Sequence, residues 1–169
     1  GLSLVGSTIS GTPTANGTNE FTVKVTSGDG QIATRPLSIK VLPEVSITTV
    51  SLPSGIVDTV YATTLTATGG DSTFVWSIAS GTLPDGLTLS ADTISGTPTA
   101  AATSTFTVQV ATGDGQTATK ELSIAVHGTL SITTTSLSDG MEGLVYKDTL
   151  VATGGDSTYT WSVSAGTLP

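Results

Sequence analysis

The amino-acid sequence predicts an all-β protein built of tandem β-sandwich domains of about 85 residues each. Three observations lead to this prediction: a repeat with a fixed offset, short stretches in which apolar and polar residues alternate, and glycine-containing turns between them. Alternation with a period of two is typical of half-buried strands. About seven such strands separated by turns are typical of a sandwich. No stretch shows the 3.6-residue periodicity of an amphipathic helix.

The repeat is visible as motifs that recur at an offset of 85 residues. Residues 9–14 (ISGTPT) recur as residues 94–99, and residues 28–31 (GDGQ) recur as residues 113–116. About 50 of the 84 aligned pairs are identical, and the alignment needs no insertion or deletion. This period is too long for a solenoid repeat and has the length of a small sandwich domain.

The strands follow one another along the chain as alternating apolar side chains. The first carries Val45, Ile47 and Thr49, the next carries Leu65 and Ala67 and ends at a Gly-Gly pair, and a further strand carries Phe74, Trp76 and Ile78. Two short pieces follow, at residues 87–89 and 93–94. The last two strands form a hairpin, because the alternations at residues 106–110 and 122–126 flank Gly113-Asp114-Gly115. We expect Asp114 and Gly115 to supply the positive φ angles of a tight turn.

The inward-facing side chains of these strands are the predicted core. The expected members are Leu65, Phe74, Trp76, Phe106, Val108, Leu122 and Ile124. Trp76 and its repeat counterpart Trp161 have the alternative role of platforms for sugar stacking. Alternation with Phe74 and Ile78 favours a buried position instead. Tyr61 and Tyr146 are expected to be half-buried.

The repeat sets the expected domain boundaries. A natural unit opens with Ser46-Ile47-Thr48-Thr49 and closes with the strand that ends near residue 126. Residues 42–126 are therefore expected to form one complete domain. Residues 1–41 are expected to be the C-terminal half of a preceding domain, and residues 127–169 the N-terminal half of a following one.

The two half domains predict an assembly. About 40 residues are too few to bury an adequate core alone, and each half leaves open strand edges. The two halves are complementary, but they are attached to opposite poles of the complete domain. We therefore expect each half to be completed head to tail, either by a neighbouring copy of the chain or within a longer continuous chain.

Composition excludes several classes of partner. The formal net charge is −8, the sequence pI is about 4.1 and there is no cysteine. An acidic surface without a basic run argues against nucleic acid and anionic membranes. No transmembrane run is visible, so we expect no membrane insertion. No signal peptide is visible either, which is expected of a segment internal to a longer exported protein.

The sequence offers no catalytic constellation, so we expect no enzyme and no cofactor. His127 is the only histidine, and its repeat counterpart is Leu42, which points to a residue of the domain junction. Serine or threonine nucleophiles lack a histidine partner elsewhere in the chain. The acidic residues fall largely in turns, where aspartate bonds to its own backbone.

Calcium is the one cofactor for which the acidic residues are candidate ligands. Asp71 and Asp114 fall in two loops that cluster at one end of a sandwich, Glu44 lies in the linker, and Glu20 is expected in a loop of the preceding domain. Carboxylate oxygens are the ligands that calcium takes. At the next junction, however, Glu44 becomes Thr129 and Glu20 becomes Thr105. The sequence therefore favours turn-forming roles for the aspartates and no resident metal.

Several motifs together resemble a known family. They are residues 46–49 (SITT), 67–70 (ATGG), 74–77 (FVWS), 81–87 (GTLPDGL) and 94–98 (ISGTP). They resemble the putative Ig domain family of bacterial surface proteins, which is close to cadherin-like, dystroglycan-type repeats. The resemblance covers the whole chain and implies Ig-like sandwiches in long arrays of exported adhesins. Where the family often has Asp-x-x-Gly, this sequence reads Ala111-Thr112-Gly113-Asp114-Gly115, which argues against an inherited calcium site.

Two functions follow as hypotheses. The first is a structural module of an extracellular filament, stalk or cell-surface protein. The second is an adhesin module that binds a glycan or protein ligand, with or without calcium at its junctions. Binding loops vary on a constant scaffold, whereas residues 69–72 and 28–31 are preserved between the repeats. The sequence therefore favours the structural role.

Overall fold

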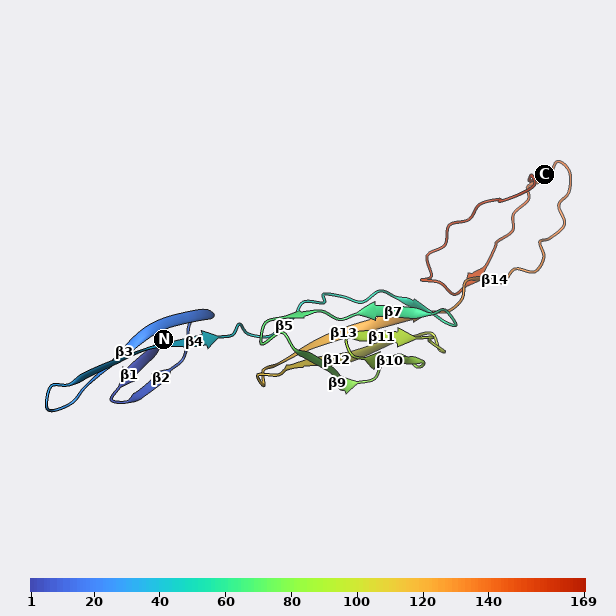
Figure 1. The fold of residues 1–169 in the computed structure, drawn as a ribbon. Coiled ribbons are helices and arrows are strands. Elements are labelled where there is room, and N and C mark those ends of the chain that lie inside the picture. The colour runs from blue at the N-terminus through green and yellow to red at the C-terminus, as the bar shows by residue number, and fades with distance from the viewer.

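The computed structural model describes residues 1–169 and contains strands, turns and loops but no helix. The molecule is extended: residues 1–41 lie at one end, residues 43–127 form the middle, and the C-terminal residues lie at the other end (Figure 1). The prediction of an all-β fold is confirmed. The structure offers no helix of the length and apolar character needed to span a membrane.

The middle domain is a two-layered sandwich. One layer is a four-stranded sheet in the order β6-β13-β12-β9, and the other contains the sheet β10-β11-β7. The pair β5-β8 extends the second layer, because β8 directly follows β7 along the chain. The strands are β5 (Ser46–Ile47), β6 (Gly55–Ile56), β7 (Tyr61–Thr64), β8 (Ala67–Thr68), β9 (Phe74–Gly81), β10 (Leu87–Ser90), β11 (Thr93–Gly96), β12 (Ala102–Thr112) and β13 (Thr117–His127).

The hairpin β12-β13 shows why these residues form strands. Every second residue of β12 from Phe106 onward is buried, and Phe106 lies opposite Leu122 of β13. Branched and aromatic side chains pack well on such a pleated surface, while the intervening Thr and Gln face outward. The turn differs from the expected one, because only Gly115 adopts a positive φ, of 86°. Asp114 instead uses its carboxylate to receive hydrogen bonds within the loop.

One other local prediction needs correction, and one short strand was not predicted. The strand expected to carry both Leu65 and Ala67 is split into β7 and β8. The chain changes partner there: Leu65 N donates to Asp92 O (2.7 Å), and Thr66 O accepts from Thr48 N (2.8 Å). In addition, β6 pairs in parallel with the end of β13. A two-residue strand carries no alternation that a sequence can reveal.

The core lies entirely within the middle domain. Its twelve buried apolar residues are Val45, Ile47, Tyr61, Leu65, Leu87, Ile94, Phe106, Val108, Val110, Leu122, Ile124 and Val126. Five of the seven predicted core residues are among them. The other two, Phe74 and Trp76, are half-buried and pack against the core. The cause is that β9 is the edge strand of its sheet, so its side chains are covered from one side only.

Tyr61 is more buried than expected. It is 5 % exposed, and its hydroxyl donates to Pro53 O (3.0 Å). The ring packs over Gly55, where an added Cβ would lie 3.4 Å from Tyr61 Cδ2. A buried tyrosine keeps a hydrogen-bond partner for its hydroxyl, and this carbonyl supplies it.

Residues 1–41 reproduce only the second half of this plan. The hairpin of β1 (Leu2–Val5) and β2 (Thr8–Gly11) has the register of β10-β11, with Leu2 opposite Gly11 as Leu87 is opposite Gly96. The hairpin of β3 (Gly17–Thr26) and β4 (Ile32–Val41) corresponds to β12-β13. Neither hairpin has a third strand beside it.

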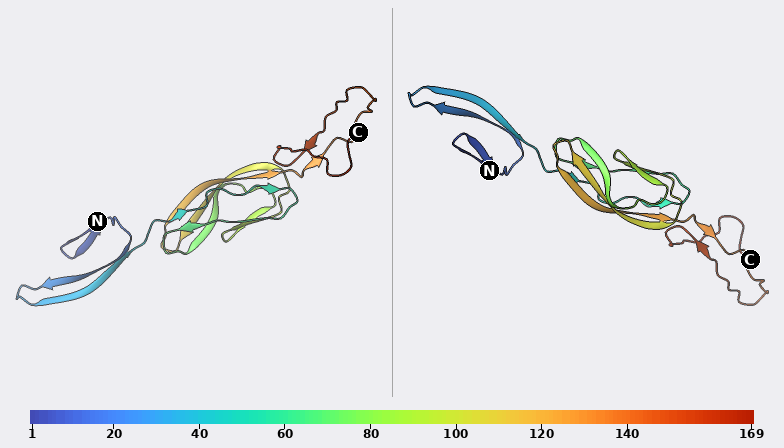
Figure 2. Two further views of the ribbon diagram at one scale, coloured as in Figure 1. Left: turned by 90° about the horizontal axis from the view of Figure 1, so that it is seen from above. Right: turned by 90° about the horizontal axis from the view of Figure 1, so that it is seen from below.

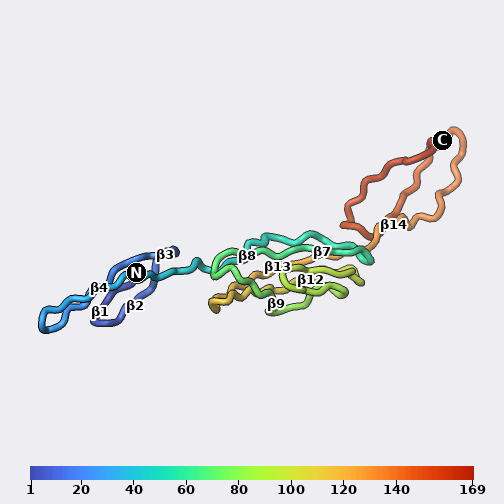
Figure 3. Tube along the Cα trace, viewed as in Figure 1, coloured from blue at the N-terminus to red at the C-terminus, as the bar shows by residue number.

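Residues 128–169 reproduce only part of the first half. The strands β14 (Ser131–Ile132) and β15 (Ala152–Thr153) correspond to β5 and β8 and pair with each other. No strand forms at the positions that correspond to β6, β7 or β9, and the chain there is an open loop (Figure 3). In the middle domain those three strands pair with β13, β11 and β12. Their counterparts β4, β2 and β3 lie at the opposite end of the molecule, and the two ends remain far apart in other views (Figure 2).

Candidate functional site

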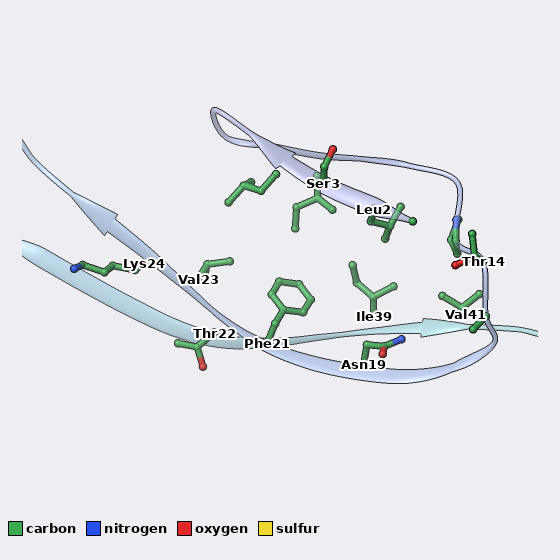
Figure 4. Close-up of a pocket in the computed structure, with 15 residues that line it drawn as sticks. Leu2, Ser3, Thr14, Asn19, Phe21, Thr22, Val23, Lys24, Ile39 and Val41 are labelled. Atoms are coloured by element: carbon green, nitrogen blue, oxygen red, sulfur yellow. The ribbon is translucent and has the colours of Figure 1, made fainter.

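An open apolar groove runs between the two hairpins of residues 1–41. It encloses about 500 Å³. In Figure 4, Leu2 points from β1 toward Phe21 and Ile39 of the β3-β4 hairpin. The main apolar side chains of this acceptor groove are Leu2, Ile9, Phe21, Val23, Ile39 and Val41.

The counterparts of these six residues are all core residues of the middle domain. They are Leu87, Ile94, Phe106, Val108, Ile124 and Val126. Equivalent apolar side chains differ in burial between the middle domain and residues 1–41: Ile94 is fully buried, whereas Ile9 is 38 % exposed. The acceptor groove is therefore a half-built sandwich interior.

The middle domain shows what fills such a groove. Its core is completed by Val45, Ile47, Tyr61 and Leu65, which all come from the first half of the repeat. At the C-terminal end of the molecule the counterparts are Leu130, Ile132, Tyr146 and Leu150, and all four are exposed. Leu150 is 45 % exposed against 2 % for Leu65. The groove and the side chains that match it thus lie on one chain but at opposite ends.

The size of the groove is also that of a small-molecule pocket. Its lining argues for a protein segment instead, because the six main apolar residues correspond position by position to core residues that contact other strands. An unpaired strand edge also borders the groove, since β2 pairs only with β1 while its counterpart β11 pairs on both sides. Such an edge is a template for another strand.

A second candidate site is the pole of the middle domain that faces residues 1–41. Asp71 Oδ1 accepts from the backbone N of Thr73 (2.9 Å), from Thr73 Oγ1 (2.5 Å) and from Gly113 N (3.2 Å). Hydrogen bonds to the charged form, above all from the Thr73 hydroxyl, hold the pKa of Asp71 below its ordinary value. Asp71 thus joins two loops that are about 40 residues apart in sequence.

Asp114 organises the adjacent β12-β13 loop. Its carboxylate accepts from the Thr112 hydroxyl and from Gln116 Nε2 (2.7 Å). These bonds lower the pKa of Asp114, with the Thr112 hydroxyl as the main cause, while the charge of Asp71 opposes them slightly. The charge of Asp71 therefore acts on Asp114. The two aspartates lie at the same end of the sandwich, as the sequence predicted.

Gln116 uses the remaining hydrogen-bonding capacity of this loop to hold the interdomain linker. Its Oε1 accepts from Val45 N (3.0 Å), and its Nε2 donates to Pro43 O (3.2 Å). Gly70 N donates to the same carbonyl (2.8 Å). The linker is thereby fixed to the pole of the domain, in an arrangement that we call the linker clamp.

Only some of the candidate calcium ligands lie close together. Asp71 and Asp114 share the pole, and the backbone of Glu44 passes beside Gly69, where an added Cβ would lie 2.0 Å from Glu44 O. Glu20 is not in a loop as predicted but within β3, opposite Ser38, because β3 already begins at Gly17. No group of three or more acidic or histidine side chains in the structure is placed to hold a metal ion.

The remaining sequence candidates have structural positions. His127 is the last residue of β13, and its carbonyl accepts from Val57 N (2.9 Å). Trp76 lies beside a shallow surface hollow with Phe74, Leu65 and Asp92. Its counterpart Trp161 is 41 % exposed.

Sequence reasoning missed the linker clamp. The available signal was that Gln116 and Gln31 are identical in the two repeats, although an exposed turn residue would be free to vary. In residues 1–41, Gln31 makes the same bond to its aspartate, with Nε2 donating to Asp29 Oδ2 (2.6 Å). The turn glutamine bonds to a linker 71 residues away in sequence. This contact depends on the tertiary fold, so no local sequence pattern predicts it.

The two-layered sandwich with a clamped linker defines an Ig-like β-sandwich module. A comparison with family models matches residues 43–127 to the family described as "Putative Ig domain", and the chain belongs to this family. Ig-like domains are typical of extracellular and surface proteins and are typically non-enzymatic. A search of curated proteins finds no match.

Several solved structures are similar to part of this chain, and two of them serve as examples. One is described as a putative alpha-galactosidase from Bacteroides fragilis NCTC 9343, with 24 % identity and a TM-score of 0.42 over 50 % of this chain. The other contains extracellular cadherin domains 1–4 of protocadherin gamma B7, with 16 % identity and a TM-score of 0.45 over 73 % of this chain. The matches span 18 % and 36 % of those two chains.

Proposed function

We propose that this chain is a structural module of an extracellular filament, stalk or cell-surface protein, in which half domains are completed head to tail by neighbouring subunits or by a continuous chain. The observation that carries the proposal is the path of the chain. It enters the middle domain at one pole through a clamped linker and leaves at the opposite pole after His127 (Figure 1). Modules connected in this way extend end to end.

The dimensions support a spacer role. The longest strands, β12 and β13, have 11 residues each and run along the long direction of the domain (Figure 1). At about 3.3 Å per residue, each repeat adds roughly 36 Å of length. The linker clamp limits bending at the junction, so successive repeats add length in a regular way.

Small-angle X-ray scattering of the purified chain at low concentration tests the spacer role. The expected result is a rod-like particle whose largest dimension falls when Gln116→Ala breaks the clamp and lets residues 1–41 swing. Gln31→Ala, in the unclamped counterpart position, is the matched control and is expected to leave the curve unchanged. A parent chain that already scatters as a flexible particle, with no rod-like profile, would contradict a rigid spacer.

A second candidate function, an adhesin module, is favoured by one observation. Trp76 is half-buried beside a hollow that also contains Asp92, and aromatic surfaces with a few polar groups are typical of ligand sites. A glycan array with the parent chain and the Trp76→Leu variant tests it. Glycan binding by the parent chain that is lost in the variant supports the adhesin function. If neither chain binds a glycan, the adhesin function is contradicted and the spacer role remains.

A further inference from the structure

We propose that Asn16 and Gly17 form a site of spontaneous chemical modification, at which the side-chain amide of the asparagine loses ammonia through a cyclic imide and becomes aspartate or isoaspartate. This inference goes beyond the spacer role and does not depend on it. The sequence contains two asparagines, Asn16 and Asn19, and only Asn16 is followed by glycine. The chain therefore offers the reaction at one asparagine and a comparison asparagine three residues away.

The reaction uses only the chain and water. The backbone nitrogen of Gly17 attacks Cγ of Asn16, and the new nitrogen–carbon bond closes the imide ring. The bond from Cγ to Nδ2 breaks, and Nδ2 leaves as ammonia with the proton of the Gly17 amide. Water then opens the ring at Cγ to give aspartate, or at the main-chain carbonyl to give isoaspartate, in which the backbone runs through Cγ. The rate of such an intramolecular attack depends on how readily the two atoms approach each other.

The structure leaves the approach of these two atoms unobstructed. Asn16 is exposed and lies in the loop that precedes β3. Gly17 begins β3 with a φ of 129°, and a Cβ added there would meet no atom within 4 Å. Glycine has wide backbone freedom and no side chain to shield its nitrogen. The two reacting groups therefore have the space that ring closure requires.

The exposure of Asn16 belongs to its position in the repeat and does not arise from the open groove. The counterparts of residues 16–18 in the middle domain are residues 101–103, and all three are exposed although that sandwich is complete. The first fully buried residue of β12 is Phe106. Packing of further strands against residues 1–41 accordingly leaves Asn16 in solvent.

Residues 16–18 also read Asn-x-Thr, which is the acceptor pattern for N-linked glycans. A glycan would be attached through the same Nδ2 atom and would prevent the loss of ammonia. That reaction needs a transferase and an activated sugar donor, whereas the imide needs only the chain and water. We therefore argue for the imide, and a glycan is one outcome of the test.

The modification would act at the junction between residues 1–41 and the middle domain. Gly17 lies opposite Val41, the last residue of β4, and the linker that follows is held at Pro43 by Gln116 and Gly70. Each conversion adds a negative charge to a chain whose net charge is already −8. Isoaspartate also lengthens the backbone by a methylene at the start of β3. Because strand pairing depends on the spacing of backbone groups, we expect the end of the β3-β4 hairpin to loosen.

The test follows the purified chain over time at neutral pH and physiological temperature. Intact mass reports the loss of ammonia and gain of water, and peptide mapping with fragmentation distinguishes aspartate from isoaspartate. The expected result is conversion of Asn16 to both products, roughly tenfold or more faster than conversion of Asn19. Asn19 is the internal control, because it lies within β3 and is followed by Glu20, whose side chain hinders ring closure.

Hydrogen exchange then tests the effect on the junction. Backbone amides in the last residues of β4 are expected to exchange faster in the converted chain than in the fresh chain, while those of the middle-domain core are unchanged. Equal exchange at the end of β4 would overturn the effect on the junction.

Two variants complete the test of the site. Asn16→Gln lengthens the side chain by a methylene, which disfavours ring closure without straining Gly17, and it is expected to abolish the early change in mass. Asn19→Gln is the matched control and is expected to leave that change unaffected. Equal rates at both asparagines, or no conversion of Asn16, overturn the inference, and so does a glycan on Asn16 of the protein purified from the cells that produce it. None of these results bears on the spacer role, which the scattering experiment on Gln116→Ala decides.

Discussion

The middle domain and the two ends of the molecule share a sequence repeat but not a structure. Phe106 is 2 % exposed in the middle domain, while its counterpart Phe21 remains partly open to solvent in the acceptor groove. Tyr61 is 5 % exposed, whereas Tyr146 is 48 % exposed. These apolar residues therefore form a core only where both halves of a repeat are present together. Substitutions at matched counterpart positions therefore test how far the two regions differ in packing.

The largest difference is expected from Phe106→Ala against Phe21→Ala. Removing the buried ring leaves a cavity in the sandwich and is expected to cost about 3–5 kcal/mol of the free energy of unfolding. Phe21→Ala is expected to cost less than about 1 kcal/mol in the isolated chain, because its ring is only partly covered. Urea denaturation of both variants measures this. Equal costs would mean that residues 1–41 already have a complete core.

A medium difference is expected from Gly70→Ala against Gly155→Ala. Both glycines have a positive φ, of 56° and 60°, so the backbone strain is shared. Only at Gly70 does the new Cβ clash, at 2.6 Å from Cγ2 of the buried Thr112, whereas at Gly155 it makes an ordinary contact of 3.7 Å with Leu130 Cδ1. Gly70→Ala is expected to lower the free energy of unfolding by about 1–3 kcal/mol, and calorimetry of the middle-domain transition reports it. A larger shift from Gly155→Ala would show that the C-terminal end is already packed.

A smaller difference is expected from Gln116→Ala against Gln31→Ala. Loss of the two linker bonds of Gln116 is expected to cost about 1–2 kcal/mol and to raise the mobility of residues 42–45. Gln31 bonds only within its own loop in the single chain, so its removal is expected to leave the linker unaffected. Backbone NMR order parameters of the linker are the measurement. An unchanged linker in Gln116→Ala would show that Gly70 and packing suffice.

The smallest effect is expected from acid. The folded-state pKa values of Asp71 and Asp114 are depressed by hydrogen bonds, so their contribution to stability is present above the ordinary carboxyl pKa. It is lost as the pH falls below about 4 toward the lowered folded values. Both groups are solvent-exposed, so the loss is expected to be modest. Thermal melts between pH 7 and pH 3 test the direction, and stability that rises on acidification would contradict it.

Much of the fold was predictable because the responsible forces act locally. Alternation at residues 106–110 identified β12 and its inward face, and this succeeded because a strand with one buried face must alternate. The placement of Asp71 and Asp114 at one pole was predictable from the order of the loops. The core-facing side of Trp76 was predicted correctly but its degree of burial was overestimated, because alternation identifies the face of a strand and not whether the strand lies at a sheet edge.

The sequence was sufficient to predict the all-β class, the 85-residue repeat, the main hairpins and the family resemblance, because each depends on side-chain periodicity or on turn residues close in the chain. Which of the equivalent side chains are buried depends on the tertiary structure. Leu65 and Leu150 are the same residue in nearly the same local sequence, but Leu65 has the β10-β11 and β12-β13 hairpins around it and Leu150 does not. It likewise decided that Gln116 clamps a linker distant in sequence. Burial and long-range hydrogen bonds depend on partners brought together by folding, and in this molecule the partners of the two ends are not beside them.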